Sequence, residues 1–410
     1  MKKIFFAGLL LGGIAGHTQP VLKTGPDMPR EWIDADTHHK VIRLTNNDRS
    51  NLSFYFHNDP FAGSKMVYYS TEKIPTAAAK QETYNSNTRD RQLYLLDLNT
   101  LQSERLTNHT SPMQGEIVCP RLNKAFFQVK DSVFAVDLST KKESLIYIFP
   151  ADFKATVTTI NADGTLLAGA RYSDAEKELF RKYPGKGSYF TIIYEAKLPR
   201  TLFTIDIRSG RLNKIFTDSA WLNHIQFSPA DPRLLMFCHE GPWHKVDRIW
   251  TINVITKTVK LVHKRTMPME IAGHEWFSKD GKTIWFDLQQ PRGVTFFVGG
   301  TDLATGTTTK YRLQRNEWSV HYTTSPDGKL FAGDGGAPGA VAKAPDGQWI
   351  YLFTPENGIF KAEKLVNMQQ HRYQLEPNIH FTPDQRYILF RANFEGKENI
   401  YAVAIKPTRS

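Results

Sequence analysis

Cysteine is scarce in this sequence, and long apolar segments are almost absent. The chain has 410 residues but only two cysteines, Cys119 and Cys238, so it is not a small scaffold held together by disulfides. One disulfide between these two residues stays open as an alternative to free thiols. Beyond Gln19, no apolar run approaches the roughly 20 residues that a membrane-spanning helix needs, so we expect no membrane insertion.

A nucleic-acid signature is also missing, although the chain is basic. The formal net charge is +11 and the pI is about 9.4, a balance that favours an anionic partner. No long basic run and no RNA-binding motif occurs. We therefore expect an acidic oligosaccharide rather than nucleic acid, with a merely solvated basic surface as the alternative. No obligate protein partner is evident.

The N-terminus has the charge and hydropathy order of a signal peptide. Met1-Lys2-Lys3 precedes an apolar run from Ile4 to Ala15, and polar residues follow at 17–19. No cysteine near the end of the run offers a site for a lipid. We expect residues 1–19 to be removed, residues 20–410 to form one domain, and the mature protein to be periplasmic or secreted.

What the sequence does contain is an internal repeat of about 45 to 55 residues. One strand and the Asp-containing turn after it recur at 92–100, 133–140 and 202–210. A second turn, between the first two strands of a unit, recurs as Asp-Gly or a close variant at 161–164, 278–281, 325–328 and 382–385. This period with these turns is typical of the four-stranded blade of a β-propeller.

Counting the units predicts an all-β fold, a seven-bladed β-propeller. The units begin near Leu52, Glu116, Ala155, Ala220, Ile271, Ser319 and Glu376. Because the last unit supplies only three strands, we expect the N-terminal strand 41–45 to pair with 400–405 and close the ring without an open sheet edge. The segment 174–183 is helical in composition, interrupts the third unit, and should lie over one face of the ring.

Polar side chains recur where the innermost strands begin. A single histidine in such a place is more often a hydrogen-bonded core residue, but repetition at equivalent positions of several units favours a shared site at one rim of the ring. The residues are His224, His274, His321, Glu376, Asn378 and His380. A further segment dense in polar residues, 237–250, falls in a predicted loop between two strands, where function concentrates.

These motifs together resemble those of the oligogalacturonate lyases, seven-bladed propellers that cleave short pectin fragments by β-elimination. The resemblance covers most of the mature chain, and its most specific part is the Cys-His-Glu-Gly-Pro run. The motifs that carry it are Ala220-Trp221-Leu222, Cys238-His239-Glu240-Gly241-Pro242, Val246-Asp247-Arg248, Gly273-His274-Glu275-Trp276, His321 and Gly333-Asp334-Gly335.

The resemblance implies a role for each matching residue. His274 matches the catalytic base, Arg248 the arginine that binds the substrate carboxylate, and His321 a metal ligand. Where the family completes its metal site with a histidine-proline-histidine stretch, this chain has Glu376-Pro377-Asn378. Oxygen ligands beside one imidazole still suit Mn²⁺, or Ca²⁺ as the alternative. We therefore expect His321, Glu376 and Asn378 to hold a divalent cation.

The wall of the substrate site is predicted to include His224, His239 and Trp276. Two of the functional residues also have structural alternatives: an ion pair with Asp247 or Asp231 for Arg248, and a strand-end hydrogen bond for Glu376. A Gly-x-Ser-x-Gly elbow is absent, which argues against the propeller of a prolyl peptidase. The remaining alternative to a lyase is a non-catalytic periplasmic propeller that binds or scaffolds.

Overall fold

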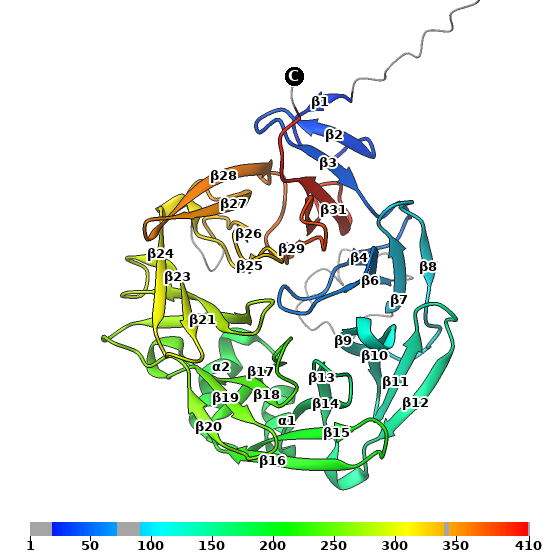
Figure 1. Cartoon of the computed structure of the whole chain (residues 1–410), viewed down its shortest axis with the longest axis vertical. Helices are drawn as coiled ribbons and strands as arrows, with labels where there is room; N and C mark the ends of the chain where they lie inside the picture. The colour runs from blue at the N-terminus through cyan, green and yellow to red at the C-terminus, as the bar shows by residue number, and fades with distance from the viewer. Residues whose placement is uncertain (1–18, 72–90, 340–343, 409–410) are drawn as a thin grey trace, which may run out of the picture.

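The structure, a computed structural model, describes residues 19–71, 91–339 and 344–408. The predicted signal peptide therefore lies almost wholly outside the described residues. Within them the chain is mostly β-structure, and its sheets stand next to one another around a ring (Figure 1). This arrangement confirms the prediction of an all-β, propeller-like fold.

Four sheets follow one another along the chain, each with antiparallel neighbours. The first comprises β4 (Asn51–Leu52), β5 (Phe61–Ala62), β6 (Lys65–Thr71), β7 (Arg91–Asp97) and β8 (Ser103–Arg105). The second comprises β9 (Met113–Cys119), β10 (Lys124–Val129), β11 (Ser132–Asp137) and β12 (Glu143–Ile148). The third comprises β13 (Thr156–Ile160), β14 (Leu166–Arg171), β15 (Arg200–Asp206) and β16 (Leu212–Asp218). The fourth comprises β17 (Trp221–Phe227), β18 (Leu234–Glu240), β19 (Ile249–Asn253) and β20 (Val259–Leu261).

The next sheet has eight strands and consists of two antiparallel halves. One half comprises β21 (Ile271–Phe277), β22 (Thr283–Gln289), β23 (Phe296–Asp302) and β24 (Thr308–Leu313). The other comprises β25 (Tyr322–Thr324), β26 (Phe331–Gly333), β27 (Trp349–Glu356) and β28 (Ile359–Asn367). A single parallel pairing, of Arg312 with Ile359, joins the two halves.

The last sheet unites the two ends of the chain. Its strand order is β1 (Val21–Leu22), β2 (Glu31–Asp34), β3 (Lys40–Arg43), β31 (Asn399–Ala404), β30 (Tyr387–Ala392) and β29 (His380–Phe381). Strand β3 pairs antiparallel with β31, with Val41 opposite Val403 and Arg43 opposite Tyr401. The predicted closure by the N-terminal strand is thus confirmed. Strands β1 and β2, which extend this sheet outward, were not predicted.

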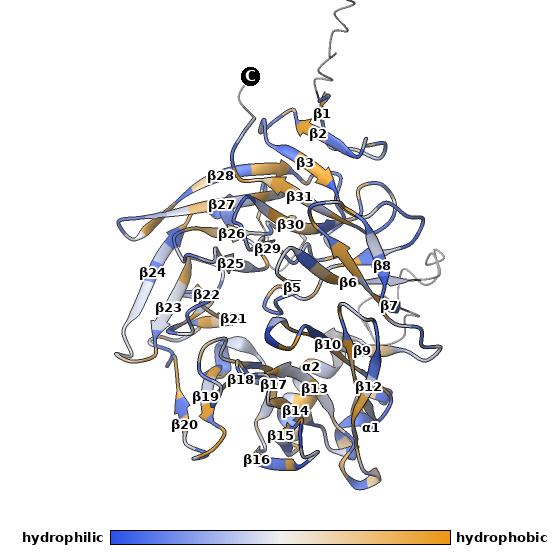
Figure 2. Ribbon diagram, turned by 45° about the vertical axis from the view of Figure 1, so that its right-hand side comes forward, coloured by the Kyte–Doolittle hydropathy of each residue, from blue (hydrophilic) through white to orange (hydrophobic). Residues whose placement is uncertain are grey.

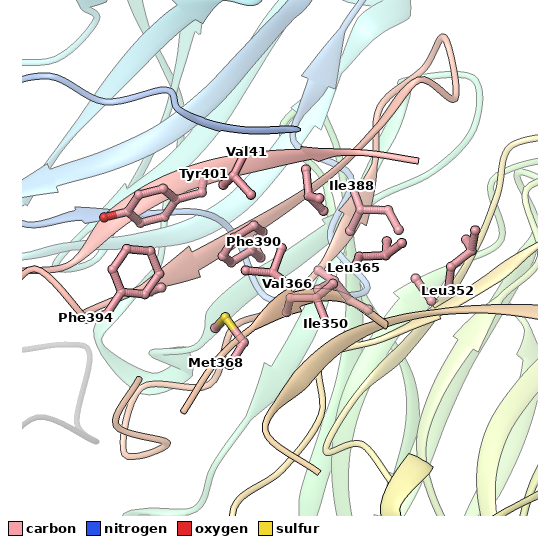
Figure 3. Packing of buried hydrophobic residues seen from close by; sticks show 14 of the residues in the cluster. Val41, Ile350, Leu352, Leu365, Val366, Met368, Ile388, Phe390, Phe394 and Tyr401 are labelled. Atoms are coloured by element: carbon pink, nitrogen blue, oxygen red, sulfur yellow. The ribbon is translucent and has the colours of Figure 1, made fainter. Parts of the chain in front are cut away.

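Apolar side chains on alternate strand positions fill the spaces between neighbouring sheets. In Figure 2 the hydrophobic colour is concentrated on the strands and the connecting loops are largely hydrophilic. Figure 3 shows one such core, where Val41, Phe390 and Tyr401 pack against Ile350 and Val366 of the preceding unit. Because both termini contribute side chains to this core, it fastens the ring where the chain begins and ends.

The repeated Asp-Gly turns have the backbone that their sequence predicts. Gly164, Gly281 and Gly328 have φ of +75°, +69° and +72°, a left-handed conformation that glycine adopts without a Cβ clash. In the last unit Gln385 takes this position with φ of +57°. The turn geometry is therefore kept even where the glycine is replaced.

The predicted helical insert is present and is longer than expected. It consists of α1 (Asp174–Lys182) and α2 (Lys186–Ala196), between β14 and β15. The side chain of Ser173 caps α1 by accepting a hydrogen bond from the Glu176 amide. Helix α2 was missed because its aromatic and β-branched residues have no clear helical periodicity; Phe190 packs there against the rings of Trp221 and Trp243.

Short 3₁₀ turns lie at η3 (Pro120–Leu122), η4 (Ala151–Phe153), η5 (Trp243–Lys245) and η6 (Arg315–Glu317). The two cysteines, on β9 and β18, are buried free thiols, so no disulfide joins them.

Candidate functional site

Three residues in or just before innermost strands lie in the left-handed backbone region at equivalent positions of their units. These residues are His224, His274 and Asn378, with φ of +47°, +45° and +47°. In β17 and β21 the pairing register shifts at this point, which marks a β-bulge. Such a conformation is uncommon outside glycine but is tolerated best by asparagine, aspartate and histidine. All three side chains face a segment at the centre of the ring.

That segment, residues 55–58, is called the central loop here. Asn378 Oδ1 accepts a hydrogen bond of 2.9 Å from the Phe56 amide, and the Glu116 carboxylate accepts one of 2.6 Å from the Tyr55 amide. His380 Nε2 lies 3.1 Å from the carbonyl oxygen of Asn58. Inner strands of different units therefore hold the loop in place. Sequence reasoning missed it, although the aromatic run after β4 was a visible signal.

His274 has the surroundings of a general base. Its Nδ1 lies 2.9 Å from Asp287 Oδ1, and its side chain is about 15% exposed. With the Nδ1 hydrogen donated to this carboxylate, the ring presents the lone pair of Nε2 to a substrate. The ring centroids of His274 and His321 are 4.8 Å apart, so the structure brings these two predicted residues together.

His321 is fully buried and is held on two sides. Its Nδ1 lies 2.8 Å from Asp334 Oδ2, and its Nε2 lies 3.2 Å from the Tyr55 hydroxyl and 3.7 Å from Glu376 Oε2. Phe56 stacks on the ring at a centroid distance of 4.6 Å. A carboxylate on one imidazole nitrogen is the usual support for a histidine that binds a metal through the other. His321 and Glu376 therefore suit a shared cation.

Asn378, the third predicted ligand, is not placed as one. Its side chain is fully buried, and its amide group binds the Phe56 amide and the Glu376 carbonyl oxygen. The physical reason is its left-handed backbone just before β29, which directs this side chain under the central loop. Across the described ranges, no cluster of three or more His, Cys, Asp or Glu side chains is arranged to hold a metal ion.

Arg248 is buried between two carboxylates that the sequence did not single out. Its Nε lies 2.9 Å from Glu275 Oε2, and its Nη1 lies 2.6 Å from Glu240 Oε1. Burial, the largest single influence, raises the pKa of Glu240 and of Glu275, but Arg248 and His224 together outweigh it and lower both pKa values. The partners are thus neither Asp247 nor Asp231, and the trio carries one net negative charge.

His224 faces this trio. Its Nε2 lies 3.5 Å from Glu240 Oε2 and its Nδ1 lies 3.9 Å from Glu275 Oε1. On its other side, the ring centroids of Tyr55 and His57 are each 6.1 Å away. The predicted place of His224 in the wall of the site therefore agrees with its surroundings, between the buried carboxylates and the central loop.

The structure does not bring His239 or Trp276 into the site. The His239 ring stacks on Trp250 at 4.8 Å, and Trp276 is 4% exposed in a core cluster, where it packs behind Phe56 of the central loop. Successive side chains of a strand point to opposite faces. Because Glu240 and Glu275 point toward Arg248, their neighbours His239 and Trp276 point away from it.

A cavity of about 200 Å³ lies beside His224. Its walls come from the central loop, from β13 and β14, and from β17. Tyr55 borders the cavity and also contacts His321, so the cavity adjoins the histidine cluster.

Among the described helices, none is long and apolar enough to cross a membrane.

Comparison with known proteins places the chain in a family. A model of the oligogalacturonate lyase family matches residues 29–408. The chain is 28% identical over 397 residues to the oligogalacturonate lyase of Dickeya dadantii, covering 91% of this chain and 95% of that protein. It is 26% identical over 394 residues to the oligogalacturonide lyase of Pectobacterium atrosepticum, with the same coverage of 91% and 95%.

Two solved structures have the same fold. An oligogalacturonate lyase in complex with manganese superposes with a TM-score of 0.75 at 24% identity, covering 94% of this chain and 99% of that one. The oligogalacturonate lyase of Vibrio parahaemolyticus superposes with a TM-score of 0.74 at 25% identity, covering 92% of this chain and 96% of that one.

Proposed function

Because the chain belongs to the oligogalacturonate lyase family, we propose that its site cleaves acidic oligosaccharides from pectin by β-elimination, with His274 as the base. The observation that carries this assignment is the His274–Asp287 pair, 2.9 Å apart, beside His321 at the centre of the ring. An imidazole whose Nδ1 donates to a carboxylate leaves Nε2 free to accept a proton from the substrate.

In the reaction, Nε2 of His274 takes the proton from C5 of the uronate. The electron pair of that bond forms the C4=C5 double bond, the C4–O4 bond breaks, and the leaving oxygen takes up a proton. The products are an unsaturated uronide and a shortened oligosaccharide. Asp287 stabilises the imidazolium that forms on His274, as a carboxylate does in other base–carboxylate pairs.

The uronate carboxylate gains negative charge in the transition state, and groups that bind it there lower the barrier. Arg248 would bind the uronate carboxylate through Nη2, because its Nε and Nη1 bind Glu275 and Glu240. A divalent cation, Mn²⁺ in first place and Ca²⁺ as the alternative, would be held by His321 Nε2 and the Glu376 carboxylate and would neutralise the substrate carboxylate.

We also propose that the ring has seven blades and that the protein is exported. If the two halves of the eight-stranded sheet are counted as separate blades, the ring has seven blades. The charge and hydropathy order of the first 19 residues supports export to the periplasm or beyond.

The test is incubation with di- and trigalacturonate while the absorbance of the unsaturated product is followed. Wild type should give a rising trace, and His274→Ala should lower turnover by roughly 10² or more. His109→Ala is the matched control, because His109 pairs with Glu143 on another sheet and should turn over normally. A flat wild-type trace with every uronide tested would contradict the lyase and favour a binding protein.

A further inference from the structure

The cavity beside His224 carries an inference that rests on the proposed function and extends it to substrate specificity. Its volume of about 200 Å³ is many times what a single water molecule needs, so it has room for a ring-sized group. Tyr55 lines it and also contacts His321, whose ring lies beside His274. A substrate whose cleaved residue lies at His274 would therefore extend its neighbouring residue into this cavity.

The side chains around the cavity offer hydroxyl and amide groups. Among them are Thr156, Thr158, Tyr172 and Asn223. The two tyrosine rings, Tyr55 and Tyr172, add flat apolar surface. A sugar ring presents hydroxyl groups at its edge and C–H groups on its faces, so these walls match an uncharged pyranose on both counts.

In the described part of these walls the ionisable nitrogen groups are the imidazoles of His57 and His224, and His224 faces Glu240 and Glu275. Of the described residues that line the cavity, none is a lysine, arginine, aspartate or glutamate. His57 also lines it, and burial, with His224 and His321 nearby, lowers the pKa of His57 well below its usual range, so this ring is neutral. A carboxylate is normally bound by arginine or lysine, and burying one without such a partner is costly.

We propose that this cavity is a subsite for an uncharged sugar residue, a methyl-esterified galacturonate or a neutral pyranose, adjacent to the uronate that is cleaved. The enzyme would then act on partly esterified or mixed oligosaccharides and not only on fully acidic ones. The Thr156 side chain lies at the start of β13 and would meet the ring of this residue.

The first experiment compares kcat/KM for trigalacturonate and for its monomethyl esters. In wild type at least one ester should match or exceed the free acid. Thr156→Lys places a cation in the cavity and should shift the ester-to-acid ratio toward the acid by about tenfold or more. Thr309→Lys, on the exposed outer strand β24, adds the same charge elsewhere and should leave the ratio unchanged.

A second readout does not need turnover. Methyl α-galactopyranoside, which has no carboxylate, should give saturation-transfer NMR signals with wild type, weaker signals with Tyr172→Phe, and still weaker ones with Thr156→Lys. If wild type cleaves the free acid but rejects every ester, or if Thr156→Lys and Thr309→Lys behave alike in both assays, the subsite proposal is wrong. Sugar binding without any uronide cleavage would support the subsite and refute the lyase.

Discussion

His274 and His321 have the same kind of partner on Nδ1 and different surroundings on Nε2. Asp287 supports His274, and Asp334 supports His321. Only His321 has the Glu376 carboxylate 3.7 Å from its Nε2. The same support therefore serves a base in one place and a cation ligand in the other, and substitution of the two aspartates should separate these roles.

We expect Asp287→Asn to lower kcat by about 10² or more with little change in KM, because the asparagine amide disfavours the tautomer that leaves Nε2 free. Asp334→Asn is the matched comparison and should instead weaken cation affinity by about 10- to 100-fold. The pH profile of kcat and calorimetric titration with Mn²⁺ distinguish the two effects. Equal losses of kcat in both variants would contradict the division of roles.

The cation assignment depends on Glu376. Glu376→Gln should weaken Mn²⁺ binding by about 10-fold or more, because an amide oxygen carries no charge, and excess Mn²⁺ should restore part of the activity. Wild type treated with a chelator should lose activity and regain it with Mn²⁺. An unchanged Mn²⁺ affinity in the variant, or full activity in chelator, would show that Glu376 is not a ligand.

At the scale of elements, one buried ion pair attaches the helical insert to the ring. Glu176 of α1 and Arg200 of β15 are 1% and 2% exposed as side chains. Arg200 also donates to the Leu222 carbonyl oxygen and lies over the ring of Tyr172. The insert therefore shares an anchor with β17 and with the wall of the cavity.

Glu176→Gln should destabilise the protein by about 3 to 5 kcal/mol, because it leaves the Arg200 charge buried without its partner. Thermal unfolding followed by circular dichroism measures the loss. Glu178→Gln, on the same helix, breaks the exposed pair with Arg181 and should leave the melting temperature nearly unchanged. Similar melting temperatures for the two variants would contradict the anchor.

At the scale of the whole molecule, stability should fall on mild acidification. Burial lowers the pKa of His371 to about 4, against about 6.5 in an unfolded chain. Below pH 6.5 the unfolded state binds a proton that the folded state does not, so stability that is fully present above pH 6.5 is lost as the pH falls toward 4. The loss from this one group is about 3 kcal/mol.

His371→Gln should therefore flatten the dependence of the unfolding free energy on pH between about 6.5 and 4, even if the variant is less stable at pH 8. Urea unfolding at several pH values gives this slope. His38→Gln is the control, since His38 is exposed on the surface. A slope equal to that of wild type would show that His371 already binds its proton in the folded state.

The sequence by itself determined the repeat, the turns and the closure of the ring. These features depend on local chemistry: strand alternation, the left-handed glycine of Gly281 or Gly328, and a last unit of three strands that leaves its fourth to the N-terminal strand. The match of His274 and His321 to family motifs likewise needed only neighbouring residues. Such motifs lie in contiguous stretches of sequence, so they can be recognised without knowledge of the fold.

Only the tertiary structure decided which partners the side chains of the site contact. Asn378 was expected to bind metal, but it holds the central loop, and Arg248 binds Glu240 and Glu275. The contacts of Asn378 with Phe56 and of Arg248 with Glu275 join different units of the ring, and that of Arg248 with Glu240 lies within one unit. The face on which a side chain lies depends on the local backbone of its strand and on what packs against it. No local pattern contains this information, because a shift of one residue in register moves a side chain to the opposite face.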